Sequence, residues 1–408
     1  MTNLPFGFNL PGQGGPGDPD WTQKAPLFAE LQKLMSWSGG PVNWDLARQL
    51  AISNVGSQDR AVTSAERREV ADALRLADLW LDPLTTLPSG VHEPAAWSRV
   101  DWIEKTLPVW SSLCDPVAAR VVDAMGGALP EEAKAQAGPL LGMMSQAGGL
   151  MFGAQVGQAL ANLAGEVLSS TDVGLPLGPA GVAALLPINV AEFGSGLERP
   201  ADEVRLYLAL REAAHHRLFA HVPWLRQHLL DAVDAYARGI RIDSGAIERA
   251  MHEIDPSNPE SLQQALSGGM FEPETTPEQQ VVLRRLETAL ALVEGWVDSV
   301  ASAAASDKLP GAAALGETLR RRRATGGPAE QTFATLVGLE LRPRRLREAS
   351  TLWSALADRR GNDGRDAVWG HPDLLPSADD LDDPEGFVTR SEGGGEGATF
   401  PDLPPTGL

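Results

Sequence analysis

The stretch Asp202-Glu-Val-Arg-Leu-Tyr-Leu-Ala-Leu-Arg-Glu-Ala-Ala-His-His-Arg-Leu-Phe219 decides the fold. At a step of about 100° per residue, its apolar side chains point to every side of a helix axis. A helix that is apolar all round is normally buried, so the sequence predicts a central helix at 202–220. Its middle nevertheless carries four ionisable residues: Arg211, Glu212, His215 and His216. Because buried charges must be paired or bound to a metal, we also expect the functional site here.

Glu212 and His215 lie three residues apart and therefore share one helix face. Zinc peptidases carry the helical pattern H-E-x-x-H, in which two histidines bind the metal and the glutamate activates water. Here Arg211 stands at the first histidine position, and a permanently cationic guanidinium cannot bind zinc. Glu212 and His215 therefore predict one of two arrangements: a metal site, or a Glu–His–Arg hydrogen-bonded network that fixes helix packing.

A later segment, Glu294-Gly-Trp-Val-Asp298, places two carboxylates four residues apart on one helix face. Some zinc peptidases take their third ligand from such a glutamate, and the aspartate then orients a ligand histidine. Apolar neighbours favour partial burial of both side chains over a solvated helix face. We therefore expect Glu294 to be a metal ligand if zinc binds. Three histidines are alternative ligands: His216, His221 and His371.

The residues around the central helix resemble a known family. The stretch 211–229, above all Val222-Pro-Trp-Leu225, is similar to the signature of zincin-like metallopeptidases in a bacterial group described as hydrolases. A sister group is associated with deazaflavin-cofactor biosynthesis. The resemblance extends to residues 293–295, 337–341 and 369–376 and covers most of residues 45–390. It implies a mainly α, zincin-like fold and a zinc-dependent hydrolase or peptidase.

The resemblance also assigns roles to single residues. Glu212 matches the general base, His215 a zinc ligand and Glu294 a possible third ligand. Arg211 matches a position where the sister group has its other ligand histidine, and Trp296 replaces a residue that is often histidine there.

Composition narrows the class of function. The 408 residues include 34 Lys and Arg against 54 Asp and Glu, a formal charge of −20, which repels phosphate backbones and anionic membranes. The lone Cys114 excludes a disulfide framework and a cysteine zinc cluster. The first residues lack a basic segment followed by an apolar run, so we expect no signal peptide and a cytoplasmic protein. Nucleic-acid and membrane partners are therefore not expected.

The pattern along the chain predicts a mainly α protein with at most a small β-sheet. We expect a flexible Gly/Pro-rich tail at 1–44, a helical region at 45–172 and a zincin-like core at 173–310. A C-terminal helical region at 311–372 and an acidic disordered tail at 373–408 follow. The apolar segment 182–193 contains Pro187 and predicts an edge strand, along which a peptide substrate could extend the sheet.

Two further patterns concern packing. Gly153 and Gly157 form a G-x-x-x-G pattern in a polar-interrupted helix, which favours close packing of a soluble helix over a membrane span. The basic run Arg320–Arg323, together with Arg342, Arg344 and Arg345, either docks the acidic tail or forms a solvated face. We favour the solvated face.

Two functions follow from these residues. The first is a zinc-dependent hydrolase, expected to be a metallopeptidase that acts on a peptide or protein, with Glu212 activating a water on zinc held by His215 and Glu294. The second is a catalytically inactive binding or scaffolding module, in which Arg211 forms an ion pair with Glu212 or Glu294. The direction of the Arg211 side chain distinguishes the two.

Overall fold

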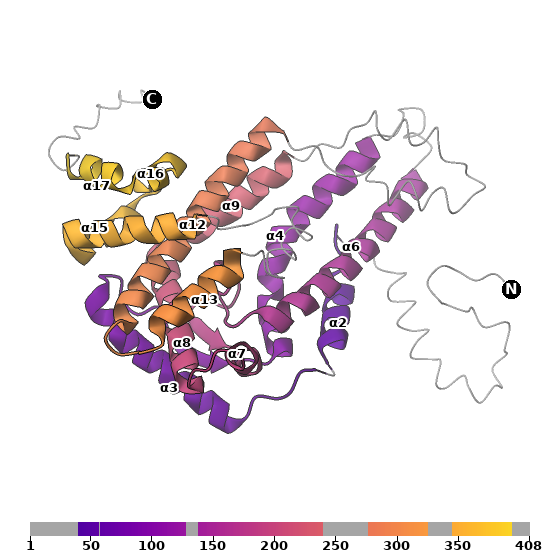
Figure 1. Ribbon diagram of the computed structural model, residues 1–408. Helices are drawn as coiled ribbons and strands as arrows, with labels where there is room; N and C mark the ends of the chain where they lie inside the picture. The colour runs from indigo at the N-terminus through magenta and orange to yellow at the C-terminus, as the bar shows by residue number, and fades with distance from the viewer. Residues whose placement is uncertain (1–39, 57, 128–137, 240–275, 325–344, 394–408) are drawn as a thin grey trace, which may run out of the picture.

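The computed structural model describes residues 40–56, 58–127, 138–239, 276–324 and 345–393. Helices dominate, and the described strands form one two-stranded sheet, which confirms the predicted fold class (Figure 1). Buried side chains from Val42 to Val388 belong to one hydrophobic core. Of the predicted tail at 1–44, residues 1–39 lie outside the described residues. The first described helix, α2, spans Trp44–Val55.

The N-terminal helices are α2, α3 (Ser64–Leu81), α4 (Arg99–Gly127) and α6 (Gly138–Glu166). Helix α2 packs closely along α6 (Figure 1). A Cβ atom on Gly153 would lie 2.6 Å from the Asn43 carbonyl oxygen, and one on Gly157 would lie 2.6 Å from that of Ala47. The G-x-x-x-G pattern therefore allows two helix backbones to approach closely, as the sequence predicts.

The sheet pairs β1 (Glu93–Ala96) with β2 (Val182–Leu185) in parallel, with Glu93 opposite Val182. The prediction of a strand over 182–193 is wrong beyond Leu185. Pro187 begins helix α7 (Pro187–Gly194), because proline lacks an N–H that the first helical turn does not need.

The second side of β2 is also paired. The Ser170 N–H donates to the Ala184 carbonyl at 3.0 Å, and the Leu186 N–H donates to the Leu168 carbonyl at 3.0 Å. With β1 on the other side, β2 has no free edge along which a substrate peptide could add a strand. The predicted substrate path along this segment is therefore wrong.

Helix α8 (Ala201–His221) is the predicted central helix, one residue longer at each end. Its residues from Tyr207 to Leu218 are all buried. It packs against α3, β2 and α12 (Pro277–Ala305). Helix α12 begins with Pro277 in its first turn, and Thr276 caps it through a reciprocal bond with Gln279. Helix α9 (Leu225–Arg238) follows α8 and also contacts α12.

The C-terminal part comprises α13 (Ala312–Ala324), α15 (Leu346–Asp366), α16 (Ala378–Asp382) and α17 (Pro384–Gly393). The last two helices contradict the predicted disorder of the tail from residue 373. Leu381 and Val388 are each 1% exposed, so this acidic segment contributes apolar side chains to the core. Residues 394–408 lie outside the described part of the chain.

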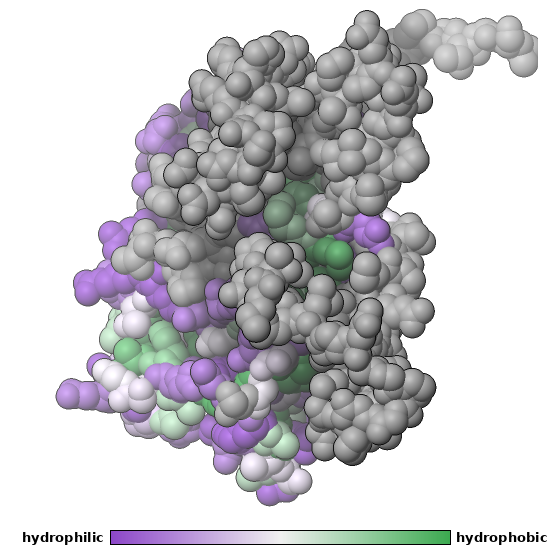
Figure 2. Space-filling view, turned by 90° about the vertical axis from the view of Figure 1, so that its right-hand side faces the viewer, coloured by the Kyte–Doolittle hydropathy of each residue, from purple (hydrophilic) through white to green (hydrophobic). Residues whose placement is uncertain are grey.

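Within the described residues, no helix is long and apolar enough to cross a membrane. On the face shown in Figure 2, hydrophilic side chains are interspersed with hydrophobic ones over the described surface.

Candidate functional site

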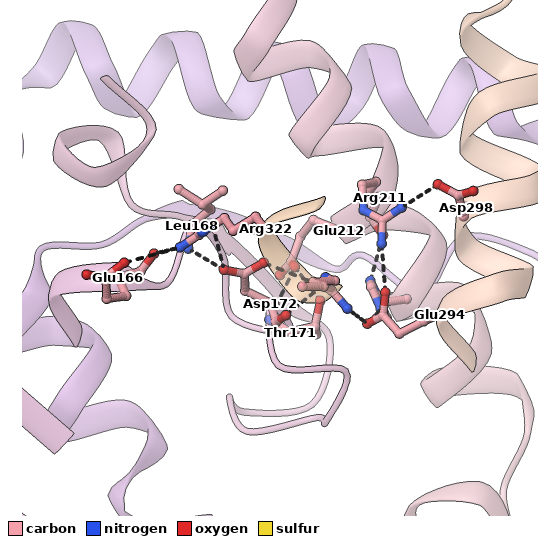
Figure 3. Close-up of polar contacts among 11 residues, drawn as sticks. Glu166, Leu168, Thr171, Asp172, Arg211, Glu212, Glu294, Asp298 and Arg322 are labelled. Carbon is pink, nitrogen blue, oxygen red and sulfur yellow. Dashed lines mark hydrogen bonds and ion pairs between the residues drawn. The ribbon is translucent and has the colours of Figure 1, made fainter. Parts of the chain in front are cut away.

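Helix α8 connects two buried polar clusters, each of which joins a glutamate to a histidine. The Glu294 cluster comprises Arg211, His215, Glu294, Asp298, Arg320 and Arg323. The Glu212 cluster comprises Ser170, Thr171, the Ala184 N–H, Glu212 and His216. Figure 3 shows Arg211 of α8 reaching toward Glu294 and Asp298, and Glu212 lying beside Thr171.

Glu294 is 1% exposed and is surrounded by cationic side chains. Its Oε2 lies 2.7 Å from Arg211 Nη2, and its Oε1 lies 2.5 Å from Arg323 Nη1. His215 Nε2 lies 3.0 Å from the same Oε1. Two guanidinium groups from different helices thus bind the one carboxylate that the sequence predicts as a metal ligand.

Asp298 fixes the direction of Arg211. Its Oδ1 lies 3.2 Å from Arg211 Nη1, while its Oδ2 accepts from Arg320 Nη1 at 3.0 Å and from Ser350 Oγ at 3.1 Å. Arg211 therefore bridges Glu294 and Asp298, which are one turn apart on α12. Planar guanidinium groups suit such a double contact.

These charges determine the ionisation of Glu294. Burial alone would raise its pKa, but the charges of Arg323, His215 and Arg211 outweigh burial and hold the pKa well below its ordinary value. Glu294 is therefore a carboxylate at neutral pH, and its negative charge is compensated inside the protein.

Both ring nitrogens of His215 face oxygen atoms. Nδ1 lies 2.9 Å from the Arg211 carbonyl oxygen, and Nε2 lies 3.0 Å from Glu294 Oε1. Both oxygens are hydrogen-bond acceptors. Nε2, the nitrogen that a metal would use, therefore faces the carboxylate of Glu294.

The Glu212 cluster contains hydroxyl and backbone N–H donors beside His216. Glu212 Oε2 accepts from Thr171 Oγ1 at 2.5 Å and from the Thr171 N–H at 3.3 Å. Oε1 accepts from Ser170 Oγ and from the Ala184 N–H at 3.2 Å, and His216 Nε2 lies 3.3 Å away. Glu212 thereby ties α8 to β2 and to the turn that precedes β2.

The pKa of Glu212 is low. Burial alone would raise it, but hydrogen bonds and charge from His216, with hydrogen bonds from Ser169 and Ser170, lower the pKa to about 2. A general base works best when its pKa lies near the working pH. This carboxylate is instead saturated with donors, which suits a structural role.

The basic run at 320–323 does not form the predicted solvated face. Arg320 binds Asp298, and Arg323 binds Glu294 and donates to the Asp172 carbonyl at 2.6 Å. Arg322 donates to the Glu166 carbonyl (Figure 3). Only Arg321 of the four, 76% exposed, fits the prediction. The physical reason is that buried carboxylates on α12 require compensating cations, which α13 supplies.

The alternative prediction, docking of the acidic tail, holds for one arginine. Arg345 donates to the Ala378 carbonyl and pairs with Asp382 of α16. Arg342 and Arg344 lie outside the described residues.

The three alternative metal-ligand histidines each have another contact. His216 lies beside Glu212, and His221 Nε2 lies 3.2 Å from the Ser89 carbonyl oxygen. His371 is exposed, and its Nδ1 accepts from the Asp373 N–H at 3.2 Å. In the part of the chain that the structure describes, no group of three or more His, Cys, Asp or Glu side chains could hold a metal ion.

Zinc therefore does not fit the residues as they are arranged. A zinc site needs a neutral imidazole and carboxylate oxygens that are free to bind the ion. Here His215 Nε2 lies 3.0 Å from Glu294 Oε1, and the two Glu294 oxygens lie against the guanidinium groups of Arg211 and Arg323, which are permanent cations. Trp296, at the other altered position, donates through Nε1 to Asp366 at 2.9 Å.

Three partners of these glutamates are not predicted by the sequence: Ser170, Thr171 and Arg323. The two hydroxyl residues lie in a turn whose place beside α8 follows only from the pairing of β2. Arg323 carries the signal of a basic run, but its direction depends on the packing of α13 against α12. Both features are long-range contacts that a single sequence does not encode locally.

Comparison with known proteins agrees with this architecture. The sequence matches the zincin-like metallopeptidase family over residues 42–388. It is similar in structure to a Chloroflexus aurantiacus protein, described as a candidate hydrolase with a novel fold, at 21% sequence identity and a TM-score of 0.60. That similarity covers 86% of this chain and 99% of the other. No curated protein matches the sequence.

Proposed function

This chain belongs to the zincin-like metallopeptidase family, and we propose that it uses the family's fold as a binding scaffold and not as a zinc peptidase. The observation that carries the proposal is the pair of guanidinium groups on Glu294, from Arg211 at 2.7 Å and Arg323 at 2.5 Å. They supply, from inside the protein, the positive charge that a metal would bring to this carboxylate.

Three features support this proposal. Replacement of the first histidine by Arg211 removes a ligand and adds a cation. Glu212, the residue matched to the general base, is 1% exposed and saturated with hydrogen-bond donors. The edge of β2 that a substrate peptide would need is already paired. The fold therefore keeps the framework of the family while its polar centre stabilises the core.

The proposal is tested by the zinc content of the purified full-length chain, measured by mass spectrometry after exposure to zinc and dialysis. We expect less than about a tenth of a zinc ion per chain. Arg211→His, which restores H-E-x-x-H, should raise the zinc content, while the matched variant Arg211→Lys should not. One zinc per chain in the unaltered protein would contradict the proposal.

A second candidate function is a zinc-dependent hydrolase, with Glu212 as the base and with His215 and Glu294 as ligands. One observation favours it: His215 Nδ1 faces the Arg211 carbonyl at 2.9 Å, the contact by which many metal-binding histidines fix their orientation. It requires Arg211 and Arg323 to leave Glu294. Loss of casein hydrolysis in Glu212→Gln, with unchanged stability and zinc content, would support this function. A cytoplasmic location stays a prediction from the sequence.

A further inference from the structure

Helices α13 and α15 both lie beside α12 (Figure 1), and a hollow of about 750 Å³ opens between the three helices. Its volume falls in the range of about 300–1,000 Å³ that is typical of ligand sites. Five serines line it: Ser299, Ser302 and Ser306 of α12, and Ser350 and Ser354 of α15. At steps of three and four residues, the serines of each helix share one face. The two helices therefore present a row of hydroxyl groups to the hollow.

The floor of the hollow contains a buried hydroxyl group. Tyr207 is fully buried, and its Oη has no hydrogen-bond partner of standard geometry among the described residues. Gly316 lines the hollow at this point, and a Cβ atom on it would lie 2.8 Å from Tyr207 Oη. Burial raises the pKa of Tyr207, and Ser302, another lining residue, offsets part of this rise. Because buried polar groups normally have partners, this hydroxyl indicates that the hollow is a place for a polar ligand.

The lining groups keep hydrogen-bonding capacity of both kinds. Ser299 Oγ and Ser354 Oγ lie 3.0 Å apart and need one proton between them, so the second proton is free to donate. Ser350 donates to Asp298 Oδ2 at 3.1 Å and still accepts through its lone pairs. Asn362 donates through Nδ2 to a backbone carbonyl at 3.2 Å, and its Oδ1 has no partner among the described residues. The hollow thus offers free donors beside free acceptors.

The charges at the hollow argue against an anionic ligand. Two lining guanidinium groups are paired with buried carboxylates, Arg320 with Asp298 at 3.0 Å and Arg365 with Asp366 at 2.7 Å. Asp358 also lines the hollow, is exposed, and has no ion pair with another residue that the structure describes. The uncompensated charge among these groups is therefore negative, and it repels phosphates and carboxylates.

A neutral ligand rich in hydroxyl groups matches these features. An ammonium group only donates hydrogen bonds and a carboxylate only accepts them, whereas each hydroxyl group of a sugar does both. The side chains between the serines are small and apolar, among them Ala303, Ala313 and Ala357. They leave room for the C–H faces of a sugar ring.

We propose that the hollow between α12, α13 and α15 binds a neutral carbohydrate. Sugar hydroxyl groups donate to Asp358 and to Asn362 Oδ1, and they accept from the Ser299–Ser354 pair. A further sugar hydroxyl donates to Ser302, whose own proton then turns toward the buried tyrosine. The inference rests on the proposed scaffold function and names the class of ligand that the scaffold binds. Because sugar binding and zinc content are measured separately, either proposal can fail without the other.

Two neighbouring alanines of α13 provide a matched pair of variants. Ala313 and Ala314 are both exposed, but Ala314 does not line the hollow. Leucine is a good helix former, so Ala313→Leu and Ala314→Leu should both fold. Ala313→Leu places its larger side chain in the hollow, whereas Ala314→Leu places the same side chain outside it. A third variant, Asp358→Ala, removes an acceptor without filling the hollow.

The probe is an array of immobilised oligosaccharides, to which the fluorescently labelled full-length chain is applied at physiological salt. The array carries neutral chains of glucose, galactose, mannose or N-acetylglucosamine, chains with free amino groups, and chains with carboxylate or sulfate groups. We expect the unaltered chain and Ala314→Leu to bind a neutral oligosaccharide. Titration of that oligosaccharide in solution should show an affinity about tenfold or more lower for Ala313→Leu and for Asp358→Ala.

Each contrary outcome overturns a definite part of the proposal. Absence of binding to every neutral oligosaccharide would overturn the carbohydrate as the ligand. Binding confined to the amino or the acidic sugars would show that charge selects the ligand, and would overturn the neutral class. Equal affinity of Ala313→Leu and the unaltered chain would overturn the hollow as the site. If circular dichroism shows that Ala313→Leu does not fold, equal affinity of Asp358→Ala would overturn the site instead.

Discussion

Two buried glutamates, Glu212 on α8 and Glu294 on α12, are each 1% exposed, and each lies beside a histidine of α8. Their charges are nevertheless compensated differently. Glu294 is held by the guanidinium groups of Arg211 and Arg323. Glu212 is held by hydroxyl and backbone N–H donors and by His216. The comparison shows that one carboxylate in this fold is compensated by two permanent cations, while the other is compensated by oriented dipoles together with one imidazole.

The difference has a consequence for substitution. Guanidinium groups can only donate hydrogen bonds, whereas hydroxyl groups can rotate and accept one. Loss of the carboxylate charge at 294 therefore leaves Arg211 and Arg323 without the carboxylate that they share, but the same loss at 212 leaves groups that can adapt.

Glu294→Gln should destabilise the protein most, by about 3–5 kcal/mol, because it leaves buried cations without their carboxylate. Chemical denaturation of the variant and of the unaltered chain measures this difference. A loss below about 1 kcal/mol would mean that water or other groups already neutralise Arg211 and Arg323.

Acid should remove the stability that ionised Glu212 contributes. Since folding lowers its pKa from 4.5 to about 2, the contribution is complete above about pH 4.5 and is lost as the pH falls toward 2. The free energy of unfolding, followed from pH 5 to pH 2, should fall more steeply in the unaltered chain than in Glu212→Gln. Parallel curves would contradict the low pKa.

Two arginines of the same run provide a matched pair. Arg323→Gln should cost about 1.5–3 kcal/mol, because its hydrogen bond to the buried carboxylate of Glu294 is lost. Arg321→Gln, at a side chain that is 76% exposed, should change the stability by less than about 0.5 kcal/mol. Equal effects of the two substitutions would show that α13 does not insert Arg323 as described.

Glu212→Gln should have the smallest effect of the substitutions within the clusters, about 1 kcal/mol, because Ser170 and Thr171 can turn to accept from the new amide. Thermal or chemical unfolding gives this value. An effect as large as that of Glu294→Gln would remove the distinction between the two clusters.

Local patterns predicted much of the helical fold. The apolar stretch predicted α8 to within one residue at each end. Glu212, His215, Glu294 and Asp298 were also identified as the buried polar residues at the centre. These predictions succeeded because helix periodicity and the cost of buried charge are properties of short segments.

The arrangement of the partners could not be predicted in the same way. The resemblance to zinc peptidases led to a metal at His215 and Glu294, but Arg323 reaches Glu294 from a helix that begins near residue 312. Ser170 and Thr171 reach Glu212 through a turn that the parallel pairing of β2 positions. Tertiary packing, and not local sequence, decides which charges meet.

The most direct test of the central claim is an anomalous diffraction measurement at the zinc edge, on crystals of the full-length chain grown with zinc. We predict no anomalous peak between His215 and Glu294, and the Arg211 guanidinium within hydrogen-bond distance of Glu294. A peak about 2.0–2.2 Å from both His215 Nε2 and a Glu294 oxygen, with Arg211 displaced, would contradict the claim.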